Sequence, residues 1–213
     1  MWTEIDEARP TDIVGRPGRG GRQSPVALRI LAAAAPMLYM RGVHAVSADA
    51  VIAAADVTKA TFYRHFPTKD DLVVAYLTAA HEGEVQAVDR WRTELPGEPG
   101  KVLRRYAEML GEASCVPGYH GCPFVNATAE YPDAGHPARQ VVARHRDWLD
   151  ATAAALLAQL GVPTPERLAR QLVMLRDGFA VAADAAGSDP HLRAAALDDL
   201  IDAATILVRA ALG

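Results

Sequence analysis

The sequence predicts an all-helical protein. Apolar residues recur at spacings of three and four along most of the chain, and Gly/Pro-rich turn signals separate these segments. Half of the 213 residues are hydrophobic but only 6% are aromatic, which favours helices that pack through Ala and Leu. The alternation typical of a strand is missing. A chain of this length can bury a sizeable core.

Two short helices are expected in residues 47–66. Ser47 should cap a helix over residues 48–55, and Thr58 a second one over residues 59–65. Asp56 lies between them, where a tight turn needs a residue that tolerates left-handed backbone. A helix of seven residues is not stable alone, so Phe62 and Phe66, four residues apart, should anchor it against its neighbours.

The face opposite Phe62 carries small, hydroxyl-bearing and basic side chains, a mixture that suits a DNA groove. Ala60 and Arg64 should lie farthest from the core, with Thr61 and Tyr63 beside them and Lys59 and His65 nearer the core edge. Thr68 should cap a third helix that begins with Lys69. A cation at a helix N-terminus is disfavoured unless an anion joins it, and a DNA phosphate would supply that anion. A solvated surface lysine is the alternative.

Residues 24–76 resemble the DNA-binding domain of the TetR family of bacterial transcriptional repressors. The resemblance rests on R-G at residues 41–42, I-A-x-A-x-V at 52–57, T-F-Y-R-H-F at 61–66 and K-x-x-L at 69–72. It implies that a recognition helix over residues 59–65 enters the major groove, with Tyr63, His65 and Lys69 touching the DNA backbone or base edges. The chain departs from the family at Asp56, where Gly is usual, and at Pro36, which should kink the first helix.

Charge is segregated along the chain, whose net charge is -4. Residues 13–69 hold eight basic and two acidic side chains, whereas residues 70–213 hold thirteen basic and twenty acidic ones. A basic N-terminal module on an acidic body concentrates the attraction for DNA at the helix-turn-helix. We also expect a flexible basic arm over residues 1–23, whose Arg16, Arg19 and Arg22 either enter a minor groove or make loose phosphate contacts.

The rest of the chain divides into a helix-turn-helix domain over residues 24–70 and a larger helical regulatory and dimerisation domain over residues 71–213. Helices are expected over residues 69–94, 101–114, 123–130, 137–160, 165–186 and 191–212. The last two carry apolar stripes with small residues beside them, such as Ala180 and Ala183. The resemblance implies a homodimer through these two helices, and two recognition helices one turn apart would read a palindromic operator.

The resemblance also implies a pocket for an inducing small molecule in residues 100–185. Candidate lining residues are Tyr106, Met109, Phe124, Asn126, Tyr131, Trp148, Met174 and Phe179. An ordinary place in the core is the alternative for each of them and the commoner role of apolar side chains at helical spacing. Nothing in the sequence names the ligand.

Cys115, His120, Cys122 and His136 lie in one turn-rich stretch, but their spacing matches no usual zinc site. Cys122 precedes Pro123 at a possible helix N-terminus, so it is either a redox-sensing thiol or a buried inert one. An enzyme that uses Cys122 with His120 as base lacks an oxyanion hole motif. An architectural DNA binder without a ligand is a stronger rival.

No membrane span or signal peptide is expected, because the apolar run at residues 27–40 is short and interrupted. The sequence therefore predicts a cytoplasmic, ligand-responsive repressor that binds double-stranded DNA as a homodimer. No catalytic step, metal or cofactor is expected.

Overall fold

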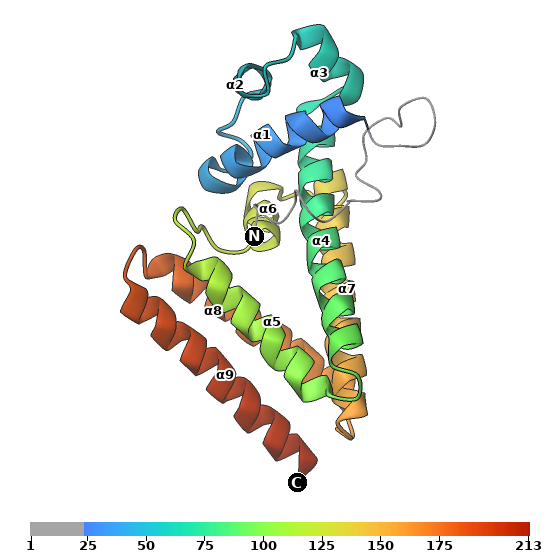
Figure 1. The fold of residues 1–213 in the computed structure, drawn as a ribbon, viewed down its shortest axis with the longest axis vertical. Coiled ribbons are helices and arrows are strands. Elements are labelled where there is room, and N and C mark those ends of the chain that lie inside the picture. The colour runs from blue at the N-terminus through green and yellow to red at the C-terminus, as the bar shows by residue number, and fades with distance from the viewer. Residues whose placement is uncertain (1–23) are drawn as a thin grey trace. The chain divides into compact units, whose positions relative to one another are not determined.

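The computed structural model describes residues 24–213, and the fold class is confirmed: these residues form nine helices and no strand (Figure 1). In order, the helices are α1 Pro25–Arg41, α2 Ala48–Ala54, α3 Lys59–His65, α4 Lys69–Glu94, α5 Pro99–Ser114, α6 Pro123–Glu130, α7 Pro137–Gln159, α8 Pro165–Ala185 and α9 Pro190–Leu212. The expected bounds agree with these to within two residues at each end.

Proline explains why the later helices begin where they do. Five of them, α5 to α9, have Pro as their first residue. Proline is favoured there because its missing N–H needs no partner in the first turn and its φ angle already suits a helix. Helix α5 starts two residues before the expected residue 101, because Pro99 occupies the first helical position and not the preceding turn.

The described residues separate into two compact units. The first unit comprises residues 24–84 and 123–143, and the second comprises residues 85–122 and 144–213. Helices α4 and α7 contribute residues to both. This division differs from the expected domain boundary at residue 70, because α6 and the first half of α4 pack in the same unit as α1 to α3.

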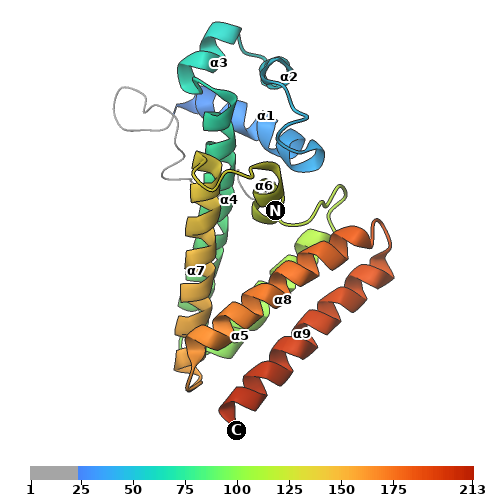
Figure 2. The ribbon, with the colours of Figure 1, turned by 180° about the vertical axis from the view of Figure 1, so that it is seen from behind.

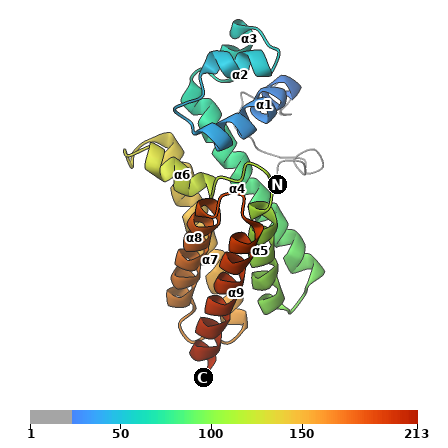
Figure 3. The same ribbon diagram turned by 90° about the vertical axis from the view of Figure 1, so that its left-hand side faces the viewer.

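The core of the first unit is built from the facing sides of α1, α2 and α3, which pack against one another (Figure 3). Ile30, Phe62, Phe66 and Leu72 are fully buried in it. Helix α1 continues through Pro36, which is exposed. The kink expected at that residue stays a prediction.

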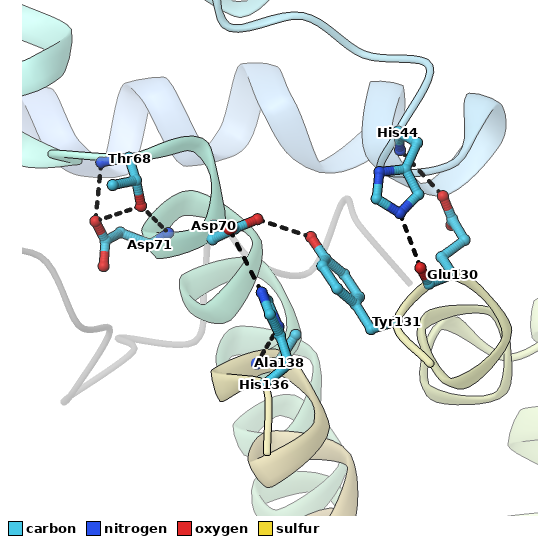
Figure 4. A network of polar contacts seen from close by, with 8 residues as sticks. All are labelled: His44, Thr68, Asp70, Asp71, Glu130, Tyr131, His136 and Ala138. Carbon is cyan, nitrogen blue, oxygen red and sulfur yellow. Dashed lines mark hydrogen bonds and ion pairs between the residues drawn. The ribbon is translucent and has the colours of Figure 1, made fainter. Parts of the chain in front are cut away.

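Polar contacts join the end of α6 and the loop after it to two other parts of the first unit (Figure 4). The His44 backbone N–H donates to Glu130 Oε2 at 3.0 Å, and His44 Nε2 lies 2.8 Å from the Glu130 carbonyl oxygen. The Tyr131 hydroxyl donates to Asp70 Oδ1 at 3.0 Å, and His136 Nε2 lies 3.4 Å from Asp70 Oδ2. Burial and then the Asp70 carboxylate raise the pKa of Tyr131 well above its ordinary value, which keeps the donor proton in place.

The second unit is organised around α5, α8 and α9, each of which packs against the other two (Figure 2). Gly111 marks the close approach of α5 and α9, since a Cβ at this position would overlap the side chain of Leu197. The Arg193 guanidinium donates to the Ser114 carbonyl and lies 5.7 Å from the Tyr119 ring centre, so the start of α9 is tied to the end of α5.

A second apolar cluster joins α5 to the parts of α4 and α7 that belong to the second unit. Trp91, Val102 and Leu156 are buried in it, one from each of these helices. Within the described residues, no helix combines the length and the hydrophobicity needed to span a bilayer.

Removing the Tyr131 hydroxyl should destabilise the first unit. We expect Tyr131→Phe to lower its free energy of unfolding by about 1 kcal/mol, because the buried Tyr131 side chain loses its hydrogen bond to the Asp70 carboxylate. Urea denaturation measures the change. Tyr63→Phe is the matched control, since that tyrosine is exposed and its loss of a hydroxyl should leave the midpoint unchanged; equal midpoints for both variants would contradict a stabilising role for the Tyr131 bond.

Candidate DNA interface and ligand cavity

The turn between α2 and α3 has the geometry that the sequence predicted. Ser47 Oγ accepts a hydrogen bond from the Ala50 N–H at 3.1 Å, and Thr58 Oγ1 accepts one from the Thr61 N–H at 3.1 Å. Asp56 has a φ angle of 49°, so the expected left-handed residue between the two helices is confirmed. Side-chain caps and one strained residue thus fix the angle at which α3 leaves α2.

Helix α3 buries one side and exposes the other. Phe62 and Phe66 are both 0% exposed, while Ala60 and Arg64 are exposed and Tyr63 is 40% exposed. The expected orientation of the helix is therefore confirmed. Thr61, beside the exposed face, is half-buried, and its hydroxyl accepts a hydrogen bond from Thr58 Oγ1 at 2.9 Å.

Lys59 at the start of α3 forms an ion pair with Asp49 of α2, with Nζ and Oδ1 3.3 Å apart. Both side chains are exposed, so the pair contributes little to stability. The Lys59 ammonium can leave Asp49 for a phosphate at small cost. The three arginines of the expected arm, Arg16, Arg19 and Arg22, lie outside the described residues.

A contact within the protein explains why a lysine can stand at the N-terminus of α4, and the sequence alone did not suggest this contact. The Lys69 ammonium donates to the Val46 carbonyl oxygen at 3.0 Å, within the loop that precedes α2. An external anion is therefore not needed to account for a lysine at this helix N-terminus. The Thr68 cap is confirmed: its hydroxyl oxygen accepts from the Asp71 N–H at 3.1 Å, and Asp71 Oδ2 accepts from the Thr68 N–H at 2.9 Å.

His65 lies at the edge between the buried and exposed sides of α3. Burial, and then the neighbouring Arg64 guanidinium, lower its pKa below the ordinary value of 6.5. Its Nδ1 is buried and has no hydrogen-bond partner among the described residues. The ring is therefore held neutral near pH 7 in the free protein.

The second unit contains an apolar cavity of about 110 Å³ between α4, α5, α7, α8 and α9. Its lining includes Val88, Val102, Leu110, Leu156, Leu172 and Leu200. Tyr106 and Trp148 also line it, so the structure brings together two of the eight residues expected to form a pocket. Thr152 adds a hydroxyl to the wall.

The other six expected pocket residues lie elsewhere. Met109 packs against the cluster beside the cavity without lining it, and Phe179 packs with Ala183 and Leu200. Met174 is 70% exposed, because it lies on the outer side of α8. Three residues belong to the first unit instead: Phe124, Asn126 and Tyr131. Apolar spacing identified residues of the core but could not separate cavity walls from solid packing.

Most residues of the cavity wall were not among the expected ones, and Arg176 is the charged residue among them. It is only 6% exposed, and its Nη1 donates to Cys122 Sγ at 2.9 Å and to Asp177 Oδ1 at 3.0 Å. The other oxygen of Asp177 lies 2.7 Å from Arg146 Nη2. The sequence does contain a sign that Arg176 is buried, because it lies at helical spacing from Val173 and Ala180, which are buried on the same side of α8.

Cys115, His120, Cys122 and His136 do not come together as a metal site in the described part of the chain. Cys115 is exposed and Cys122 is buried, and both are free thiols. His120 instead pairs with Asp184, with Nδ1 and Oδ1 3.2 Å apart. No group of three or more His, Cys, Asp or Glu side chains is placed to hold a metal ion among residues 24–213.

Known proteins resemble the chain both in sequence and in fold. The family model for bacterial regulatory proteins of the tetR family matches residues 30–76. The chain is 27% identical over 157 residues to the HTH-type transcriptional regulator YjdC of Escherichia coli (strain K12), covering 70% of this chain and 78% of YjdC. The multidrug binding protein EbrR, solved in complex with malachite green, is 25% identical with a TM-score of 0.60, covering 84% of this chain and 98% of EbrR.

The crystal structure of SCO4454, a TetR-family transcriptional regulator from Streptomyces coelicolor, is 38% identical to the chain with a TM-score of 0.80. The match covers 89% of this chain and 97% of SCO4454. This similarity extends over nearly the whole of both chains and includes the capped helix-turn-helix, so it establishes the family. The chain belongs to the TetR family, whose members are transcriptional regulators and not enzymes.

Proposed function

We propose that the protein is a cytoplasmic repressor that binds a palindromic operator as a homodimer and is released by a small molecule. The proposal that the protein binds DNA rests on α3, which buries an aromatic side and exposes a polar side. The proposed DNA contacts are Arg16, Arg19, Arg22, Ser47, Thr58, Lys59, Ala60, Thr61, Tyr63, Arg64, His65 and Lys69.

Charge supports the same assignment. Residues 13–69 carry a formal charge of +6, from eight basic and two acidic side chains, while the chain as a whole carries -4. Phosphate contacts supply most of the nonspecific affinity of a DNA-binding protein, and they require such a local excess of cations. Within α3, Lys59 and Arg64 provide two exposed cations, and Tyr63 on the same helix is also exposed.

An exposed apolar strip on the last two helices supports the homodimer. On α8, Met174 is 70% and Val181 59% exposed, and the exposed Gly178 lies between them at helical spacing. Ile206 of α9 is 66% exposed. Large apolar side chains exposed at helical spacing along α8 are typical of an interface. The strip differs from the one expected from the sequence, because Ala180 and Ala183 are buried against neighbouring helices.

The cavity of the second unit supports the response to a small molecule. It is apolar, it has few polar groups, and it lies among five helices whose packing a ligand can change. EbrR, which resembles this chain, is described as a multidrug binding protein and was solved with malachite green. A ligand alters DNA affinity only when it binds one arrangement of the protein better than another.

Selection of bound DNA from a random pool tests the proposal, followed by affinity measurements on the selected sequence. We expect Arg64→Gln to weaken binding and to reduce the slope of log affinity against log salt by about one unit, as one phosphate contact is lost. Arg144→Gln is the matched control, because it removes the same charge from an exposed position in the second unit. An equal slope for both variants would argue against a phosphate contact at Arg64, and a pool without a shared sequence would favour an architectural DNA binder.

His65 should make DNA binding depend on pH. Its pKa is lowered in the free protein, and a nearby phosphate would raise it, so the complex holds more protons than the free protein between these two pKa values. Affinity should therefore rise as the pH falls from 8 towards 6. Fluorescence anisotropy over this range measures it, and His65→Gln should flatten the profile. A wild-type profile as flat as that of the variant would place His65 away from the phosphates.

The exposed strip predicts how the protein assembles. We expect Val181→Glu combined with Ile206→Glu to convert a dimer into a monomer at micromolar concentration, because each carboxylate would be buried without a partner. Light scattering coupled to size-exclusion chromatography measures the mass. Ala151→Glu, on an exposed position of α7, is the control and should leave the mass unchanged. A double variant that remains dimeric would locate the interface elsewhere.

A further inference from the structure

We propose that the cavity of the second unit takes an uncharged, apolar molecule about the size of one aromatic ring. This inference rests on the proposed function, in which the cavity is the ligand site, and it adds the chemical class of the ligand. It follows from the volume of the cavity, from the side chains of its wall and from the partners that the charged residue of the wall has within the protein.

Volume limits the size of the ligand. The cavity measures about 110 Å³. An apolar protein cavity of about 150 Å³ stays free of water and accepts benzene, so a space of this size suits one ring without a long substituent. The wall is made of side chains from α4, α5, α7, α8 and α9. A molecule with two rings would have to push some of these helices apart, and close packing resists such a movement.

The wall is mainly hydrocarbon. Tyr106 and Trp148 contribute aromatic surfaces. Aliphatic side chains contribute most of the rest: Val88, Val102, Leu110, Leu156, Leu172 and Leu200. A ligand with an equally apolar surface leaves water and gains dispersion contacts on all sides, which is how such a space binds a molecule.

Arg176 is the charged residue of the wall, and its charge already has a partner within the protein. Its Nη1 lies 3.0 Å from Asp177 Oδ1, and it also donates to Cys122 Sγ at 2.9 Å. An anion in the cavity would therefore have to compete with Asp177 for the guanidinium. In the described part of the chain, no Asp or Glu lines the wall to receive a cation.

These contacts exclude an ionic ligand on energetic grounds. An ion that enters an apolar wall loses its hydration, and this cost is recovered only when the protein supplies an opposite charge and hydrogen bonds. Since the charge of Arg176 is paired with Asp177, neither sign of ion recovers the cost. An uncharged molecule has no such cost.

Three probes that share one ring and differ in charge at neutral pH test the class: toluene, benzoate and benzylamine. Ligand-detected NMR titration of the full chain measures their affinities. We expect toluene to bind at least about 100-fold more tightly than either ion, because each ion would have to give up its hydration. Binding of benzoate or benzylamine as tight as that of toluene would overturn the uncharged class.

Naphthalene tests the size. It has more apolar surface than toluene, so an open or easily widened site would bind it more tightly. In a space of about 110 Å³ we expect it to bind more weakly than toluene. Equal or tighter binding of naphthalene would overturn the limit of one ring.

Two variants locate the probes. Ala153→Leu fills part of the cavity and should weaken toluene by about 10-fold or more, whereas the control Ala151→Leu, at an exposed position of the same helix, should leave its affinity unchanged. Leu172→Ala enlarges the cavity and should let naphthalene bind at least as tightly as toluene. Equal toluene affinities of the two alanine variants would place the ligand outside the cavity and overturn the proposal. If a variant does not fold, the four probes on the wild-type chain still decide.

Toluene also separates this inference from the proposed function. It is added to the complex of the protein with its selected DNA, and release is measured by fluorescence anisotropy. Binding of toluene with release supports both proposals. Binding without release keeps the ligand class and contradicts the ligand response. Failure of toluene to bind overturns the ligand class, and DNA binding by the free protein is then judged from the selection alone.

Discussion

The DNA-reading part of the molecule depends on the burial of Phe62 and Phe66. Helix α3 has seven residues, fewer than an isolated helix needs, so its structure must come from packing. Two aromatic rings four residues apart, with centres 6.1 Å from each other, supply that packing on one side only. Since the rings fix the rotation of α3 about its axis, they also determine which side chains face outwards. Presentation of Tyr63 and Arg64 is a consequence of core packing.

Local signals explain why so much of the fold could be predicted from the sequence. Prolines begin six of the nine described helices, and the side chains of Ser47, Thr58 and Thr68 accept hydrogen bonds from backbone N–H groups. Each of these signals acts within four residues, where sequence spacing and spatial distance coincide. The exposed side of α3 was predictable for the same reason, because the positions of side chains around a helix follow from its periodicity.

Contacts between distant residues were not predictable in this way. Glu130 and His44 are 86 positions apart, and Lys69 and Val46 are 23 apart. The cavity is the extreme case, since its wall combines side chains from five helices and exists only because they fail to fill the space between them. Leu172 and Phe179 are both apolar and both belong to α8, yet only Leu172 lines the cavity. Composition and spacing carry no information on such a void.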